Sequence, residues 1–165
     1  MNISANMFSE KPLKGQHAVI TGGSRGIGAS ISNVLARLGA DISLTGRTNK
    51  TLLAQSNYLT KEYNVKVCTS EGNMADENQV VKCFTHITET LGHPQILINN
   101  AGVGKSAPFH KMDSGLWNEV IGLNLTGTYL CTKQVLSGMR DYGYGRIVNI
   151  SSTVGLRGYP YIAAY

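Results

Sequence analysis

Thr21-Gly-Gly-Ser-Arg-Gly-Ile-Gly28 decides the fold, because it joins a strand-length apolar run to a helix-length apolar pattern. Residues 17–21 are predicted as the strand, and apolar residues then recur at helical spacing from Ile27 to Leu38, before a natural helix cap at Gly39. Glycines allow a tight turn and let backbone N–H groups approach a pyrophosphate at the positive end of a helix dipole. An ordinary glycine-rich turn is the alternative, but the flanking strand and helix favour a dinucleotide site.

The same alternation of short and long apolar patterns continues along the chain. It predicts further strands at residues 41–45, 65–69, 95–99 and 146–151, and helices at residues 49–63, 76–91, 113–121 and 125–139, with Asp76 as an N-cap. Repeated βαβ units with right-handed crossovers build a parallel sheet. The sequence therefore predicts an α/β, Rossmann-type doubly wound parallel sheet with five strands in the order 3-2-1-4-5. Its ligand crevice would lie beside the carboxyl ends of strands one and four.

Length and composition predict a single soluble domain. The chain has 165 residues, of which 42% are hydrophobic and 15% charged, enough to bury the core of one domain. Its apolar runs are too short for a transmembrane helix, and its start lacks the pattern of a signal peptide. We therefore expect a cytoplasmic protein without a membrane partner. Residues 1–14 would be a mobile lead-in, and residues 15–165 the dinucleotide-binding domain.

Charge and cysteine usage narrow the class of partner. The net charge is +5, but Lys and Arg are scattered without interleaved aromatics, so we expect no nucleic-acid partner. A modest positive excess suits anionic small ligands. Cys68, Cys83 and Cys131 show neither a Cys-x-x-Cys pattern nor His pairing, so neither a disulfide frame nor a metal site is expected.

The residues about twenty positions past the glycines predict the type of nicotinamide cofactor. A NAD site places an acidic group there for the ribose 2′-hydroxyl. This chain has Gly46 followed by Arg47 instead. Arg47, together with Arg25 of the glycine turn, would offer guanidinium groups to a 2′-phosphate, so NADP(H) is expected in preference to NAD(H). The alternative is that Arg47 is a solvated turn residue.

Further motifs follow the glycine turn in a fixed order: Asn99-Asn-Ala-Gly102, Asn124-Leu-Thr-Gly127, Gly145-Arg-Ile-Val-Asn-Ile-Ser-Ser152 and then Tyr165. With this order and spacing, the chain resembles the short-chain dehydrogenase/reductase family, in its ketoreductase-like branch, from Gly15 onward. A complete family member has a Lys at the fourth residue after the Tyr and two further strands. The resemblance therefore implies that the domain is incomplete at its C-terminus, with the last strands and helices of the family fold missing.

The resemblance implies a ketone reduction with three catalytic residues. Tyr165 would supply the proton for the developing alkoxide, and Ser152 the hydroxyl that polarises the carbonyl. Ser151 is the alternative hydroxyl, but only Ser152 gives the family interval to Tyr165. Asn124 is similar to the family Asn that positions a water in the proton relay. Singly, each residue has a plainer interpretation as a cap or a terminal residue, and the joint spacing favours catalysis.

The resemblance also implies contacts to the cofactor beyond the glycine turn. Residues 99–102 would border the adenosine ribose, while Asn99 or Asn100 braces the sheet. Asn73-Met74 stands where the family usually has Asp and an aliphatic residue beside the adenine, so a weaker contact through the amide carbonyl is expected. The expected cofactor-binding residues are Gly22, Ser24, Arg25, Gly26, Ile27, Gly28, Arg47, Asn73, Met74, Asn100, Ala101 and Gly102.

The resemblance leaves the substrate and the state of the enzyme open. A small-molecule ketone would be reduced to a secondary alcohol, with 3-oxoacyl thioesters among the candidates, and residues 104–112 and 153–161 would line the substrate mouth. Tyr142-Gly-Tyr144 replaces the basic residues of reductases that act on acyl carrier protein, which favours a CoA ester or a free ketone. The complete form is expected to be a homo-oligomer. The alternative function is a catalytically inactive nucleotide-binding module or a gene fragment.

Overall fold

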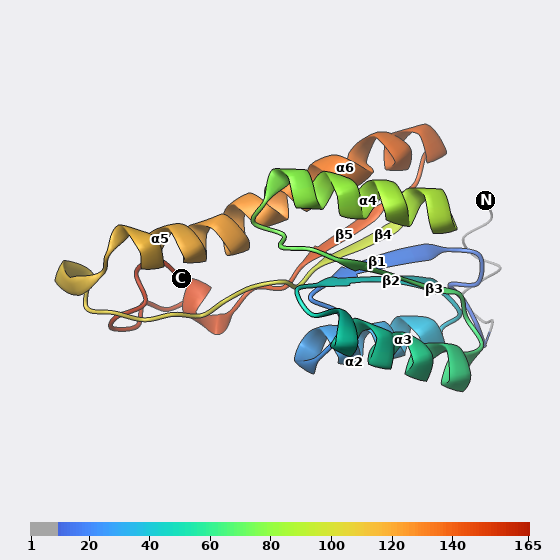
Figure 1. Ribbon diagram of the computed structural model, residues 1–165, viewed down its shortest axis with the longest axis horizontal. Helices are drawn as coiled ribbons and strands as arrows, with labels where there is room; N and C mark the ends of the chain where they lie inside the picture. Colours follow the sequence, from blue (N-terminus) through green and yellow to red (C-terminus); the bar gives the residue numbers. More distant parts are fainter. Residues whose placement is uncertain (1–9) are drawn as a thin grey trace.

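Five parallel strands form the centre of the computed structural model, which describes residues 10–165 (Figure 1). Their order is β3-β2-β1-β4-β5, which confirms the predicted doubly wound sheet. The strands are β1 (His17–Thr21), β2 (Asp41–Gly46), β3 (Val67–Glu71), β4 (Ile96–Asn99) and β5 (Arg146–Asn149). Every pair is parallel, so all carboxyl ends meet at one edge of the sheet.

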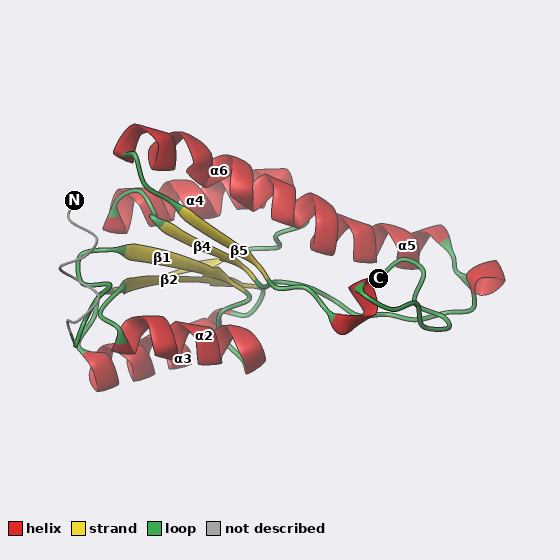
Figure 2. Ribbon diagram, turned by 180° about the vertical axis from the view of Figure 1, so that it is seen from behind, coloured by secondary structure: helices red, strands yellow, loops and turns green. Residues whose placement is uncertain are grey.

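Two helices cover each face of the sheet (Figures 1 and 2). They are α2 (Gly26–Arg37) and α3 (Asn49–Tyr63) on one face, and α4 (Glu77–Leu91) and α6 (Gly127–Tyr142) on the other. Side chains alternate along β1, so Ala18 and Ile20 pack in the core beneath α2 and α3, and Val19 packs in the core beneath α4 and α6. All three are fully buried, as expected of a strand covered on both faces.

Several boundaries differ from the sequence prediction, and two of the differences have a structural explanation. The third strand begins at Val67 rather than at residue 65. Helix α3 is capped by Asn64 in a left-handed conformation, and the chain needs two more residues before it pairs with β2. Val65 is buried in this connection, so its apolar side chain did not mark the start of the strand. The domain also includes part of the predicted lead-in. Leu13 packs against the core and its N–H donates to the carbonyl of Leu38 (2.9 Å), while residues 1–9 lie outside the described residues.

The helices predicted at residues 113–121 and 125–139 form one continuous rod. α5 (Ser114–Ile121) passes through a π-helical turn (Gly122–Thr126) directly into α6, which ends at Gly143. The predicted break between residues 121 and 125 was wrong, because tertiary contacts keep this segment helical despite its glycines. At Gly127 an added Cβ would lie only 2.8 Å from the carbonyl oxygen of Met74, so close packing requires glycine there.

The first helix of the rod and two loops form an extension that we call the arm. It comprises α5 with residues 103–113 and 150–165, and it projects beyond the sheet (Figures 1 and 2). The two loops are joined where the N–H of Ala107 donates to the carbonyl of Tyr161 (2.7 Å). Within the described part of the chain, no helix has both the length and the apolarity to cross a membrane.

β5 is an edge strand, as the sequence predicted. Ile147, Val148 and Ile150 are 36–45% exposed, whereas the side chains of β1 are buried. The strand has apolar side chains on both faces, a pattern typical of a covered parallel strand. In this structure β5 pairs with β4 alone.

His17 is a buried histidine at the amino ends of the strands. Its Nδ1 lies 2.9 Å from the carbonyl oxygen of Gly92 and its Nε2 lies 2.7 Å from Ser43 Oγ. Because a carbonyl only accepts, Nδ1 carries the proton, and Nε2 of the neutral ring accepts from the Ser43 hydroxyl. Burial lowers the pKa of His17, and the Gly92 hydrogen bond and the charge of Asp41 act in the opposite direction.

We predict that His17 makes the protein less stable in mild acid. The unfolded chain binds a proton at this residue below about pH 6.5, whereas the folded chain binds it only at lower pH. The stability contributed by neutral His17 is therefore complete above about pH 6.5 and is lost as the pH falls through the folded pKa. In His17→Phe, the buried Ser43 hydroxyl loses a hydrogen bond, at a cost of about 1–3 kcal/mol at neutral pH, whereas the carbonyl of exposed Gly92 can bond to water instead. As the pH falls through this range, the urea midpoint of unfolding should fall less for the variant than for the parent chain. An equal fall in both proteins would contradict the assignment of a neutral His17 in the folded state.

Candidate functional site

A cleft of about 620 Å³ opens at the carboxyl ends of β1 to β4. It is lined by the glycine turn after β1 and by the segments that follow β2, β3 and β4. The structure brings together in this cleft all the residues that the sequence predicted as cofactor contacts, namely Gly22, Ser24, Arg25, Gly26, Ile27, Gly28, Arg47, Asn73, Met74, Asn100, Ala101 and Gly102. Their role in binding stays a prediction.

The glycine turn is shaped for close approach of a ligand to the backbone. Gly22 and Gly26 have positive φ values of 63° and 53°, a region that side chains disfavour. At Gly28 an added Cβ would overlap the carbonyl oxygen of Gly22. α2 begins at Gly26 without a side-chain cap, so the N–H groups of its first turn stay available to an anion.

Thr21 joins the glycine turn to the segment after β4. Its Oγ1 accepts from the N–H groups of Asn100 and Ala101, both at 3.0 Å. Asn100 Nδ2 donates in return to the carbonyls of Thr21 (2.9 Å) and Gly22 (3.1 Å). Asn99 also braces the sheet, through Asn149 Oδ1 (2.9 Å). The sequence left open whether Asn99 or Asn100 braces the sheet, and the structure shows that both do. The bracing role of Thr21 was not predicted.

The segment after β2 combines basic and hydroxyl side chains. Arg47 and Thr48 line the cleft, and no Asp or Glu lines it among the described residues. Thr51, in the first turn of α3, donates to the carbonyl of Thr48 (2.9 Å), and its Oγ1 lies 3.1 Å from Ser24 Oγ. Because a hydroxyl has one proton, Ser24 is the donor in that second contact. Gly46, Thr48, Thr51, Gly72 and Leu123 line the cleft but were not predicted, although most of them lie just past a predicted strand.

The segment after β3 is anchored to the core through sulfur. Met74 is buried, and its Sδ accepts from Thr45 Oγ1 (3.4 Å) and lies 3.6 Å from Cys131 Sγ. Burial raises the pKa of the Cys131 thiol to about 12, so this sulfur is protonated at neutral pH. Cys68 and Cys83 are also free and buried. These contacts fix the floor of the cleft beneath Met74.

Asn124 lies in the π-helical turn and connects the rod to the segment that follows β4. Its Oδ1 accepts from the N–H of Val103 (2.8 Å), and its Nδ2 donates to the carbonyl of Val103 (2.9 Å). The side chain is therefore engaged by backbone at both ends. Nδ2 keeps a second N–H and Oδ1 a second lone pair, and the catalytic role of Asn124 stays a prediction.

Ser152 and Tyr165 lie in the arm rather than along the cleft. Ser152 Oγ accepts from the N–H of Val154 (3.4 Å) at the start of a short 3-10 helix, Thr153–Gly155. Tyr165 is 45% exposed, and its ring lies beside Gly104. The described residues form no hydrogen bond between Ser152 and Tyr165, and neither of them lines the cleft. Their catalytic roles stay a prediction.

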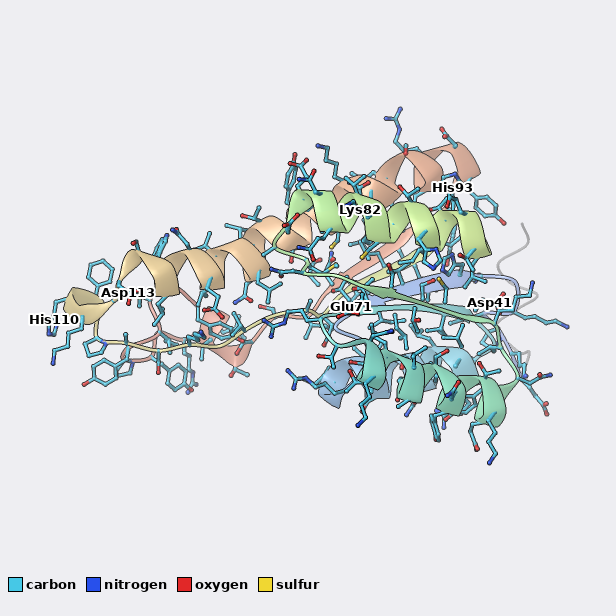
Figure 3. The ribbon with its side chains drawn as sticks, in the orientation of Figure 1. Asp41, Glu71, Lys82, His93, His110 and Asp113 are labelled. Carbon is cyan, nitrogen blue, oxygen red and sulfur yellow. The ribbon has the colours of Figure 1, made fainter. Side chains whose placement is uncertain are left out.

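Several charged residues lie away from the cleft (Figure 3). Asp41 and His93 are at the opposite end of the sheet, and His110 and Asp113 are at the tip of the arm. Asp113 caps α5 by accepting from the N–H of Leu116 (2.7 Å), which is a structural role. Among the described residues, the charged side chains that line the cleft itself are those of Arg25 and Arg47.

Comparison with known sequences agrees with this arrangement. Residues 16–165 match the family model described as short chain dehydrogenase. The chain is 38% identical over 149 residues to the 3-oxoacyl-[acyl-carrier-protein] reductase FabG of Aquifex aeolicus, covering 90% of this chain and 60% of that protein. It is 42% identical over 148 residues to the acetoacetyl-CoA reductase of Paracoccus denitrificans, covering 90% of this chain and 59% of that protein.

Comparison with solved structures gives the same result. A structure titled as a short-chain alcohol dehydrogenase from Sinorhizobium meliloti 1021 superposes with a TM-score of 0.88 at 32% identity. The match covers 93% of this chain and 60% of that one. The chain thus spans about 60% of the length of the relatives that it matches.

Proposed function

Because this chain belongs to the short-chain dehydrogenase family, we propose that it binds NADP(H) and serves the reduction of a ketone to a secondary alcohol. One observation carries the proposal: a single cleft collects the glycine turn, Arg25 and Arg47, and has no acidic side chain among its described lining. Free N–H groups at the start of α2 suit a pyrophosphate. The arginines suit a 2′-phosphate, with which a guanidinium forms charge-assisted hydrogen bonds.

The proposed chemistry divides between the cleft and the arm. When bound, NADPH supplies the hydride. Tyr165 donates a proton to the developing alkoxide, and Ser152 donates a hydrogen bond to the substrate carbonyl, which stabilises the charge that forms there. Asn124 holds the π-helical turn of the rod against Val103, at the start of the loop that follows the cleft residues 100–102. Neither hydroxyl-bearing residue lines the cleft in this structure.

For the substrate we propose a 3-oxoacyl thioester, with a CoA ester favoured over an acyl carrier protein. Relatives named as acetoacetyl-CoA reductase and 3-oxoacyl-[acyl-carrier-protein] reductase support the thioester. Tyr142 and Tyr144, in place of basic residues, support the CoA ester. The three free cysteines suit a reducing cytosol, where we place the protein, and we expect its complete form to be a homo-oligomer.

A second function, a nucleotide-binding module without catalysis, is favoured by the position of Ser152 and Tyr165 outside the cleft. It shares the cofactor site with the first function. Turnover of a thioester separates the two, whereas nucleotide binding tests what they have in common.

Cofactor preference provides that common test. We expect the chain to bind NADPH at least ~10-fold more tightly than NADH, because a 2′-phosphate gains charge-assisted hydrogen bonds of about 1.5–3 kcal/mol. Titration of each nucleotide, followed by nicotinamide fluorescence, measures both dissociation constants. Arg25→Gln and Arg47→Gln should each weaken NADPH and leave NADH nearly unchanged. Tighter binding of NADH by the parent chain would refute the proposed cofactor.

A further inference from the structure

The segment after β2 is linked to the glycine turn at both of its ends. At one end, the N–H of Gly23 donates to the carbonyl of Thr45 (3.2 Å). At the other end, the hydroxyl of Ser24 donates to Thr51 Oγ1 (3.1 Å). The first hydrogen bond joins two backbones, so it depends little on the side chains at these positions. The second joins two side chains, so it requires the hydroxyl of Thr51.

The hydroxyl of Thr51 is itself fixed by the first turn of α3. It donates to the carbonyl of Thr48 (2.9 Å), which also accepts from the backbone N–H of Thr51 (3.2 Å). Since a hydroxyl has one proton, Thr51 has none left to donate to a phosphate, although it lines the cleft. Its effect on a bound phosphate would therefore be exerted through Ser24 and the glycine turn.

The two arginines of the cleft lie on the two segments that this side-chain hydrogen bond joins. Arg25 follows Ser24 directly, and Arg47 lies between the two linked ends of the segment after β2. Two guanidinium groups that share one phosphate repel each other when no phosphate is bound. A link between their backbones reduces the freedom that binding has to remove. We propose that Thr51 is a positioning residue, which holds Arg25 and Arg47 ready for the 2′-phosphate and so strengthens the preference for NADP(H) without a direct contact.

This inference rests on the proposed binding of NADP(H), and it predicts an effect confined to the phosphorylated cofactor. Thr51→Val keeps the shape of the side chain and removes the hydroxyl. NADPH should then bind about three- to tenfold more weakly, the loss typical of one hydrogen bond, whereas the affinity for NADH should change less than about twofold. Thr51→Ser keeps the hydroxyl and should bind both nucleotides as the parent does. Thr60→Val is the matched control, because it makes the same change at an exposed α3 position outside the cleft.

Ser24→Ala, alone and combined with Thr51→Val, separates positioning from direct contact. The link is broken by the loss of either hydroxyl, so the double variant should bind NADPH within about twofold of Ser24→Ala. If each hydroxyl contacted the phosphate by itself, the two losses of affinity would multiply instead. Nicotinamide fluorescence measures the dissociation constants of NADPH and NADH for the parent chain and for every variant.

A selective loss of NADPH affinity in Thr51→Val, its recovery in Thr51→Ser and the absence of a further loss in the double variant support the inference together. The inference is overturned, and the proposed function left intact, if Thr51→Val weakens both nucleotides equally or leaves NADPH binding unchanged or tighter. Losses that multiply in the double variant, or a serine variant that fails to recover, have the same meaning. A parent chain that prefers NADH, or that binds neither nucleotide, overturns the proposed cofactor and the inference with it.

Discussion

A chain of residues 1–165 is expected to reduce acetoacetyl-CoA at least ~1000-fold more slowly than a chimaera that continues after Tyr165 with the C-terminal part of the Paracoccus denitrificans acetoacetyl-CoA reductase. The reason lies in the arm: neither Ser152 nor Tyr165 lines the cleft, and Tyr165 is 45% exposed. Proton transfer requires hydrogen-bond reach to the reacting oxygen and contributes about 10²–10⁴ in rate. A displacement of about 1 Å can cost a further hundredfold.

NADPH oxidation with acetoacetyl-CoA, followed by absorbance, measures both rates. Tyr165→Phe in the chimaera is the control: it should lose at least ~100-fold in rate while binding NADPH as before, because it removes only the proton donor. Comparable turnover by residues 1–165 and by the unmutated chimaera would show that the arm of the shorter chain assembles its own active site. That result would also exclude the inactive module as the function of this chain.

The second large effect is a reversal of cofactor preference in Gly46→Asp/Arg47→Gln. A Cβ at Gly46 would lie 3.5 Å from the Leu52 side chain and 3.7 Å from Ser24 Oγ, which are ordinary contacts, so the new carboxylate fits. It would accept from the ribose hydroxyls of NADH and repel a 2′-phosphate. We expect the ratio of NADPH to NADH affinity to fall by about 1000-fold, equivalent to about 4 kcal/mol shared between lost and gained hydrogen bonds.

Calorimetric titration of both nucleotides into the double variant and the parent chain measures this ratio. Arg37→Gln serves as the control, since it removes one positive charge from the exposed end of α2 outside the cleft. Its ratio should stay within about twofold of the parent's, because α2 places this exposed charge about 16 Å from the glycine turn, beyond the Debye length of about 8 Å. A double variant that still prefers NADPH would mean that Arg47 is the solvated turn residue of the alternative interpretation.

The fold was predictable because its determinants are local and repeated. Strand and helix periodicities, the glycine turn and the Asp76 cap each depend on a few neighbouring residues, and Asp76 does accept from the N–H of Gln79 (3.0 Å). Right-handed crossovers then fix the strand order. The order 3-2-1-4-5, which the structure confirms, could therefore be predicted without knowledge of side-chain packing.

The features that the sequence did not predict depend on partners distant along the chain. Thr21 reads as the last residue of a buried strand, and its two N–H donors are about 80 residues away, at Asn100 and Ala101. Gly122 and Gly127 predict a helix break by propensity. The contact of Asn124 with Val103 overrides that local preference. Thr51 likewise meets Ser24 only once α3 packs beside the glycine turn.

The exposed edge of β5 bears on how residues 1–165 alone will behave in concentrated solution. A strand that pairs on one side only presents a row of free N–H and C=O groups, and here apolar side chains such as Val148, 45% exposed, flank that row. Such an edge is a template for further strands, including the same strand of another molecule. Pairing of β5 with β5 of a second molecule would close at a dimer, whereas pairing of β5 with β3, the other edge strand, would extend the sheet without end.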